Sequence, residues 1–139
     1  MSTMYERPVY PEGMIRLRQP LPPCTLLRPG GERVYLPDLK GKPLVLGRDE
    51  ALAEALAKEA LEAHTFLLAE GERPSPLPLL LDPEGTLLRA IPPGGALVAD
   101  PFLEVYHLGE VAGAEEVRAW LALLEAQCPE CVVPEGEWF

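Results

Sequence analysis

Residues 44–69 have the sequence LVLGRDEALAEALAKEALEAHTFLLA, which carries the signals of a strand, a helix and a second strand. The apolar run at 44–47 is typical of a buried central strand. Residues 50–63 are almost entirely Ala, Leu, Glu and Lys with an apolar face, so they predict a helix that Asp49 can cap. Strand-like residues follow at 64–69. A strand–helix–strand unit is therefore expected at the centre of the fold.

Shorter patterns on both sides of this unit predict the remaining elements. Pro-Gly-Gly at 29–31 separates two β-prone runs, 24–27 and 32–35, which predicts an N-terminal hairpin. The other predicted elements are a helical turn at 36–40, an apolar run at 79–81, a short helix or strand at 87–91, antiparallel strands at 96–99 and 103–108, and a closing helix at 115–126. A central sheet covered by helices, an α/β layer architecture, follows from this order.

Charge and hydropathy exclude two classes of partner. The formal net charge is −10 with a pI near 4.6, and no Lys/Arg-rich run is present to neutralise a phosphate backbone, so we expect no nucleic acid partner. The N-terminal residues lack the apolar run of a secretory signal, and no stretch has the length of a membrane span. We therefore expect a cytoplasmic protein with no membrane contact. The absence of Asn and the abundance of Pro, Leu, Glu and Arg favour a thermophilic source.

Five segments show a recognisable order: CTLL at 24–27, GGERVYL at 30–36, DLKGKPLVL at 38–46, LLLDPEG at 79–85 and ALVADP at 96–101. Together they resemble the redoxin branch of the thioredoxin-like superfamily, the peroxiredoxins of the alkyl hydroperoxide reductase and thiol-specific antioxidant type. The resemblance implies a thioredoxin-like three-layer α/β fold, in which helices flank a central mixed sheet. It divides the chain into a Pro-rich N-terminal arm (1–23), a thioredoxin-like domain (24–127) and a C-terminal tail (128–139).

The chain departs from this family at the position that carries the family's chemistry. Members place the attacking cysteine at the start of the first long helix, whereas this chain has Gly47-Arg48-Asp49-Glu50 and no cysteine there. We therefore predict that the protein is not a peroxidase. Arg48 and Asp49 are suited to binding a small anion or to capping the helix, and capping is the favoured role of Asp49. The thioredoxin relatives place a cis-proline before a later strand, and Pro93 stands near that position.

Cys128-Pro129-Glu130-Cys131 is the one motif whose side chains can do chemistry that packing does not require. Two thiols three positions apart can form a disulfide and exchange it with a partner thiol. The pair follows the carboxyl end of a predicted helix in an acidic segment, and both features disfavour thiolates. We therefore favour a slow or regulatory disulfide over an efficient oxidoreductase.

Zinc binding is the alternative role of Cys128 and Cys131, since Cys-Pro-x-Cys is a common half of a zinc knuckle. Four ligands are needed, so His64, His107, Cys24 or the same motif of a second subunit would have to complete the site. A third interpretation is that the thiols have no specific role. Cys24, His64 and His107 each have a simpler interpretation. Cys24 is then a small buried hydrophobe, and the two histidines are packed or solvated side chains.

Two functions from different classes are favoured, and a third, a peroxidase that uses Cys24, is disfavoured. The first is a thiol–disulfide or redox-sensing role of Cys128 and Cys131 toward a protein thiol partner, without a cofactor. The second is a non-catalytic binding or scaffold module, as a homodimer whose tails share a zinc ion.

Overall fold

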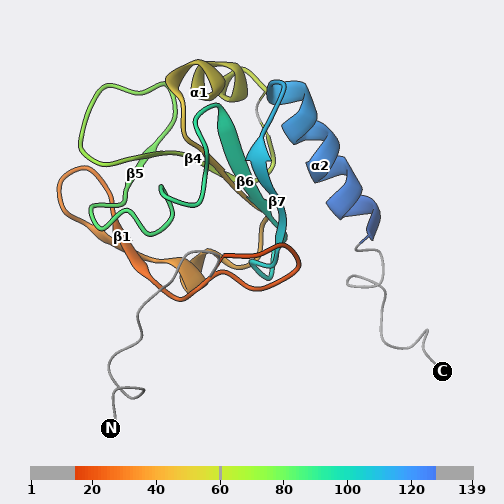
Figure 1. The fold of residues 1–139 in the computed structure, drawn as a ribbon, viewed down its shortest axis with the longest axis horizontal. Helices are drawn as coiled ribbons and strands as arrows, with labels where there is room; N and C mark the ends of the chain where they lie inside the picture. The colour runs from red at the N-terminus through yellow and green to blue at the C-terminus, as the bar shows by residue number, and fades with distance from the viewer. Residues whose placement is uncertain (1–14, 60, 128–139) are drawn as a thin grey trace, which may run out of the picture.

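The computed structural model describes residues 15–59 and 61–127, and the predicted strand–helix–strand unit lies at the centre of its sheet. The unit consists of β3 (Leu44–Gly47), α1 (Glu50–Ala57) and β4 (His64–Ala69) (Figure 1). The other elements are β1 (Thr25–Leu27), β2 (Arg33–Tyr35), the 3-10 helix η2 (Leu36–Leu39), β5 (Leu79–Leu81), β6 (Gly95–Ala99), β7 (Val105–Glu110) and α2 (Ala114–Gln127). The predicted motif at Cys128 and Cys131 lies outside the described residues.

Helix α1 ends at Ala57, whereas the composition predicts a helix to Ala63. Tertiary structure explains the difference. The amide of His64 donates to the carbonyl oxygen of Pro43 at 2.8 Å, so β4 must begin beside the start of β3. The residues after Ala57 are needed to bring the chain back to that point, and this requirement outweighs their helix propensity.

A single seven-stranded sheet, in the order β2-β1-β5-β4-β3-β6-β7, organises the described residues. Strands β5, β4 and β3 are parallel, and the remaining neighbours are antiparallel. The N-terminal hairpin is confirmed, because Thr25 pairs with Tyr35 and Leu27 with Arg33. The predicted α/β class with a central mixed sheet is confirmed as well.

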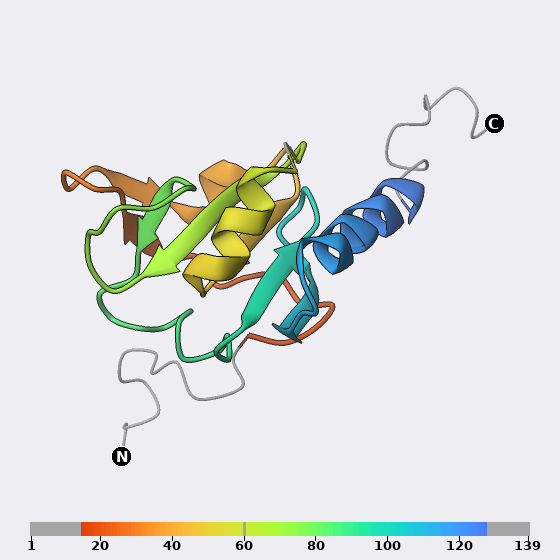
Figure 2. The ribbon, with the colours of Figure 1, turned by 90° about the horizontal axis from the view of Figure 1, so that it is seen from above.

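The two faces of the sheet are covered differently. Both α-helices pack on one face, where α1 and α2 contribute Leu52, Leu56, Val117 and Leu124 to a cluster with Val45, Leu67 and Val98. On the other face lie η2 and a segment of turns at 82–94, which contribute Leu36, Leu87 and Ile91 to a cluster with Leu46, Phe66 and Leu97. Figure 2 shows that α2 continues beyond the sheet, away from β1 and β5.

The segment at 87–91, predicted as a short helix or strand, is neither. It consists of turns, in which the amide of Arg89 donates to Gly85 and that of Ile91 to Leu87. The sequence supplies the apolar residues for this second layer, and the side chains described below fix its conformation.

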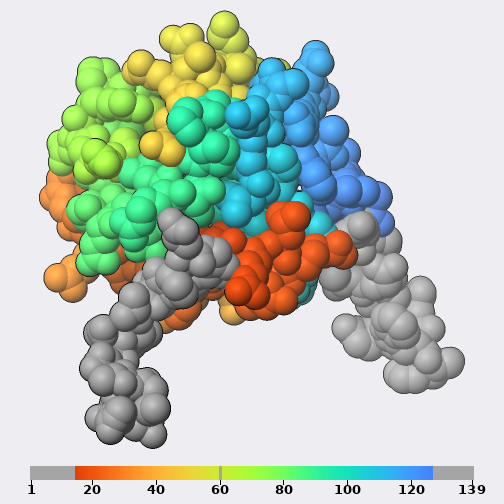
Figure 3. Space-filling view, in the orientation of Figure 1, coloured from red at the N-terminus to blue at the C-terminus, as the bar shows by residue number. Residues whose placement is uncertain are grey.

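The described part of the N-terminal arm lies along β7 (Figure 3). The amide of Leu21 donates to the carbonyl oxygen of Leu103 at 2.9 Å, and Ile15 and Leu21 are buried against the core. The Arg18 guanidinium lies 4.4 Å from the ring centroid of Tyr106. No helix within 15–59 and 61–127 combines the length and apolar composition needed to cross a membrane.

Candidate functional site

The junction between β3 and α1 is where the family resemblance places an active site. Only Arg48 and Asp49 separate Gly47 from the first residue of α1, so the helix begins directly after the strand. Neither residue is a thiol, and Cys24 is the free cysteine of the described part of the chain. The amino end of α1 therefore carries no nucleophile of the kind that a helix terminus activates.

The Arg48 side chain is bound to the backbone of the turn segment. Its Nη1 donates to the carbonyl oxygen of Leu88 at 3.1 Å and to that of Ile91 at 2.5 Å. The guanidinium thus compensates for carbonyl groups that no sheet or helix ladder uses. The Nη1 atom of Arg48 is therefore occupied by main-chain acceptors, and a small-anion site at this junction stays a prediction.

Asp49 occupies the predicted N-cap position with extended dihedral angles, φ −104° and ψ 149°. Its side chain accepts no capping hydrogen bond, so this part of the prediction is wrong. The carboxylate lies instead beside Gly94, where a Cβ atom would approach Asp49 Oδ2 to 3.6 Å. A negative charge at this place opposes the formation of a thiolate or the binding of an anion.

A buried carboxylate fixes the same turn segment from within. Asp82 is 2% exposed, and its Oδ2 accepts from the amides of Leu87 at 2.7 Å and Leu88 at 2.9 Å. Asp82 and Arg48 together supplement the main-chain hydrogen bonds of the turn segment. The sequence signals a turn at Asp82, but it does not reveal that the side chain reaches residues five and six positions ahead.

Cys24 lies just before β1, half-buried and packed against the core cluster that contains Phe66. Burial raises its thiol pKa to about 11, and the negative charges of Asp82 and Glu84 act in the same direction. The thiol is therefore protonated at neutral pH, which makes it a poor nucleophile.

The two histidines, His64 and His107, lie in different environments, and neither is part of the β3–α1 junction. Burial lowers the pKa of His64, and Lys42 acts in the same direction. The ring of His107 lies 5.4 Å from that of Trp120, and its Nε2 lies 3.2 Å from the Gly109 carbonyl oxygen. Within residues 15–59 and 61–127, no three His, Cys, Asp or Glu side chains are arranged to hold a metal ion. The zinc ligands Cys128 and Cys131 stay a prediction.

Comparison with known proteins identifies the fold of this chain. No protein-family model and no curated protein matches the sequence. Among solved structures, AhpC from Enterococcus faecalis aligns with a TM-score of 0.59 and 16% identity over 82% of this chain and 94% of that chain. The bacterioferritin comigratory protein of Xanthomonas campestris aligns at 0.54 and 18%, over 75% and 91%. A candidate protein disulfide isomerase from Bacteroides thetaiotaomicron aligns at 0.55 and 17%, over 81% and 89%.

The chain has a thioredoxin-like fold. Its neighbours include peroxiredoxin-type proteins, as the sequence resemblance implies. Identities below one fifth establish the fold alone, so the activities named for those proteins are not transferred by it. In this thioredoxin-like fold, the junction where the sequence resemblance places an active site holds Arg48 and Asp49. Every peptide bond in the described ranges is trans, so Pro93 does not supply the cis-proline.

The high pKa of Cys24 predicts a measurable difference between the folded and unfolded chain. In the variant Cys128→Ser/Cys131→Ser, Cys24 is the sole thiol, and its alkylation by iodoacetamide at pH 8 should be about a hundredfold slower folded than in urea. The rate should keep rising up to about pH 11. A rate that levels off below pH 9 would contradict the assigned pKa.

The same shift has a consequence for stability. The folded-state pKa lies above the ordinary value of 9.0, so the unfolded chain loses its thiol proton first. The stabilisation due to the protonated Cys24 is present below about pH 9 and disappears as the pH rises to about 11.

Proposed function

We propose that the protein is a cytoplasmic thioredoxin-like protein that does not reduce peroxides, and that its thiol chemistry is carried by Cys128 and Cys131. One observation carries the proposal: the β3–α1 junction holds Asp49 in place of a cysteine. The high pKa of Cys24 supports it, because that thiol cannot replace the missing nucleophile at neutral pH.

The proposed reaction is reversible disulfide exchange. The thiolate of one tail cysteine attacks a partner disulfide and forms a mixed disulfide, and the second cysteine then displaces the partner thiol. The partner is reduced, and Cys128 and Cys131 are oxidised to a disulfide. The acidic residues around the pair make this exchange slow, which suits a sensing or regulatory role toward a protein thiol.

A redox titration tests the proposal. The full chain is equilibrated in buffers with a series of ratios of reduced to oxidised glutathione, its free thiols are alkylated, and its mass is measured. We expect one two-electron transition in the wild type, no such transition in Cys128→Ser/Cys131→Ser, and an unchanged transition in the control Cys24→Ser. A transition that survives in the double variant would refute the role of the tail pair.

The second candidate is a non-catalytic binding or scaffold module, which the absence of a thiol at the β3–α1 junction also favours. In this case two tails share one zinc ion in a homodimer, each giving Cys128 and Cys131. Zinc analysis and the mass in solution distinguish the candidates: one zinc per two chains in a reduced preparation supports the module, and metal-free monomers support the redox role. The charge of −10 supports the proposal that neither candidate acts on nucleic acid.

A further inference from the structure

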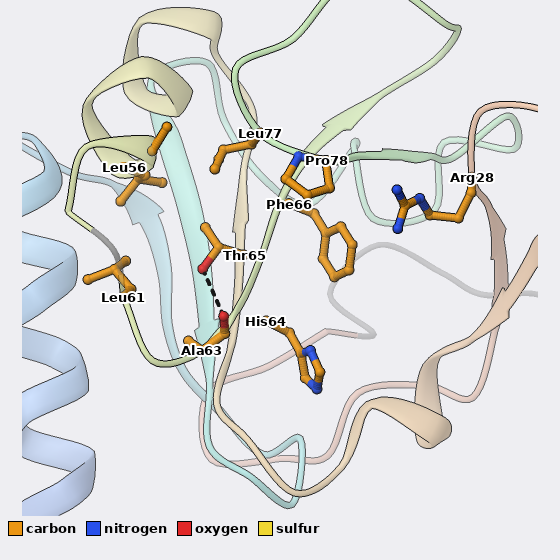
Figure 4. A pocket seen from close by; sticks show the side chains of 10 residues that line it. Arg28, Leu56, Leu61, Ala63, His64, Thr65, Phe66, Leu77 and Pro78 are labelled. Atoms are coloured by element: carbon orange, nitrogen blue, oxygen red, sulfur yellow. Dashed lines mark hydrogen bonds between the residues drawn. The ribbon is translucent and has the colours of Figure 1, made fainter.

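A groove lies beside the amino end of β4. The β3–α1 junction lies at the other end of these parallel strands. Its volume is about 390 Å³. Figure 4 shows the side chains that line it, which come from the end of α1 and the turn after it, from β4, and from the residues before β5. The lining residues include Leu56, Leu61, Leu77, Pro78, Phe66 and Arg28.

The main-chain groups of Thr65, in β4, face this groove. The amide of Leu67 donates to Pro78, and Ala69 accepts from Asp82, so these residues direct their polar groups toward β5. The amide of His64 donates to Pro43, on the side of β3. Since main-chain groups alternate along a strand, Thr65 directs its amide and carbonyl toward the β5 side.

No strand continues beside Thr65 to meet these groups. β5 begins at Leu79, whose partner in β4 is Leu67. The residue that would next donate to Thr65 in this ladder is Pro78, which has no N–H. Among residues 15–59 and 61–127, none forms a main-chain hydrogen bond with Thr65 on this side. Within the part of the chain that the structure describes, the main-chain donor and acceptor of Thr65 are therefore unpaired beside the groove.

Arg28 lines the groove, and one of its side-chain donors has no partner among the described residues. Its guanidinium lies 5.7 Å from the ring centroid of Phe66, and Nε is buried without a hydrogen-bond partner in the described part of the chain. A buried donor without a partner is costly, so Arg28 is a polar side chain of the groove that the described residues leave incompletely satisfied. Arg28 is the cation among the residues that line the groove. His64 also lines it, and burial lowers the pKa of His64, which favours its neutral form.

The two sides of the groove differ in chemistry. Leu56, Leu61 and Leu77 belong to the cluster on the helix-covered face, whereas Phe66 belongs to the opposite face, where Arg28 lies over it. Side chains of an added strand alternate between these faces. Two apolar side chains separated by one acidic side chain would therefore match the leucines on one face and Arg28 on the other.

We propose that this groove binds an extended peptide of a partner protein with the pattern apolar–acidic–apolar, which adds beside Thr65 as a short strand. The peptide main chain pairs with the amide and carbonyl of Thr65, and its carboxylate accepts from the Arg28 guanidinium. Arg28 supplies the positive charge that an acidic side chain requires, on a chain whose net charge of −10 does not favour acidic peptides in general. The site is independent of Cys128 and Cys131.

The test is a titration of the full chain with the capped peptide acetyl-Val-Leu-Glu-Val-amide, followed by the amide NMR signals of the protein. We expect saturable shifts centred on Thr65 and slower hydrogen exchange of its amide. Acetyl-Val-Leu-Gln-Val-amide should bind about tenfold more weakly, because the charged acceptor is lost. A peptide in which an ester replaces the amide facing Thr65 should also bind more weakly.

Matched variants assign the contacts. Arg28→Ala should reduce the affinity for the Glu peptide to that for the Gln peptide, Arg28→Lys should restore part of it, and the exposed Arg33→Ala should leave it unchanged. The proposal is overturned if the Glu and Gln peptides bind equally, if the shifts lie away from Thr65, or if no binding occurs at millimolar peptide. If hexanoate displaces the Glu peptide at the same concentration as free Glu peptide does, the proposed peptide ligand is wrong and the groove binds a small apolar carboxylate.

Discussion

Replacement of Asp82 by Ala is expected to lower the free energy of unfolding by about 3 kcal/mol, which corresponds to a fall of about 10 °C in the unfolding midpoint. Asp82 is 2% exposed and accepts two amide hydrogen bonds, from Leu87 and Leu88. The alanine variant leaves both amides without this acceptor in the layer that covers Leu97. Each hydrogen bond to a charged group contributes about 1.5 to 3 kcal/mol.

The matched control for this prediction is Asp82→Asn, which keeps an oxygen in the same place. Its amide oxygen can still accept from Leu87 and Leu88, so its loss of stability should be less than half that of Asp82→Ala. Thermal unfolding followed by circular dichroism measures both. If the alanine variant unfolds within 2 °C of the wild type, Asp82 does not hold the turn segment, and another group must satisfy the two amides.

Replacement of Leu97 by Ala is expected to lower the free energy of unfolding by about 3 to 4 kcal/mol. Leu97 has no exposed surface and lies in β6, between β3 and β7. Its side chain belongs to the cluster that joins the sheet to the turn segment, so neighbours on both sides restrict collapse of the cavity. The cost therefore includes a cavity as well as the lost burial.

Leu123→Ala is the control for Leu97→Ala, because Leu123 is 42% exposed on α2. Its effect should stay below about 1 kcal/mol. Urea denaturation should give the same dependence on denaturant for both variants and for the wild type. Equal losses in the two variants would mean that the sheet beneath the turn segment is not the stabilising core.

The strands could be predicted from the sequence to within a few residues, because apolar runs bounded by Pro, Gly and charged residues mark them directly. The strand β3 at Leu44–Gly47 and the strand β4 at His64–Ala69 are observed as predicted. The helix end could not be predicted, since residues 58–63 favour a helix locally while the pairing of β4 beside Pro43 requires a turn. The prediction of a short helix or strand at 87–91 was wrong for a similar reason, because side chains distant in the chain decide its conformation.

The candidate site was predictable only in part. The missing cysteine at the β3–α1 junction could be recognised from the sequence alone. The hydrogen bonds of Arg48 to the turn segment could not, because they join residues forty or more positions apart. The groove beside Thr65 also arises from tertiary structure. Pro78 is its one visible signal, since a proline before a strand ends the neighbouring ladder.

The central claim is that the thiol chemistry of this protein belongs to Cys128 and Cys131, while the β3–α1 junction and Cys24 take no part. The most direct measurement is the oxidation state of each cysteine after mild treatment of the full chain with hydrogen peroxide, read by alkylation, proteolysis and mass spectrometry. We predict a disulfide between Cys128 and Cys131, an unmodified Cys24, and slow peroxide loss. Rapid peroxide consumption with sulfenic acid or a mixed disulfide at Cys24 would contradict the account.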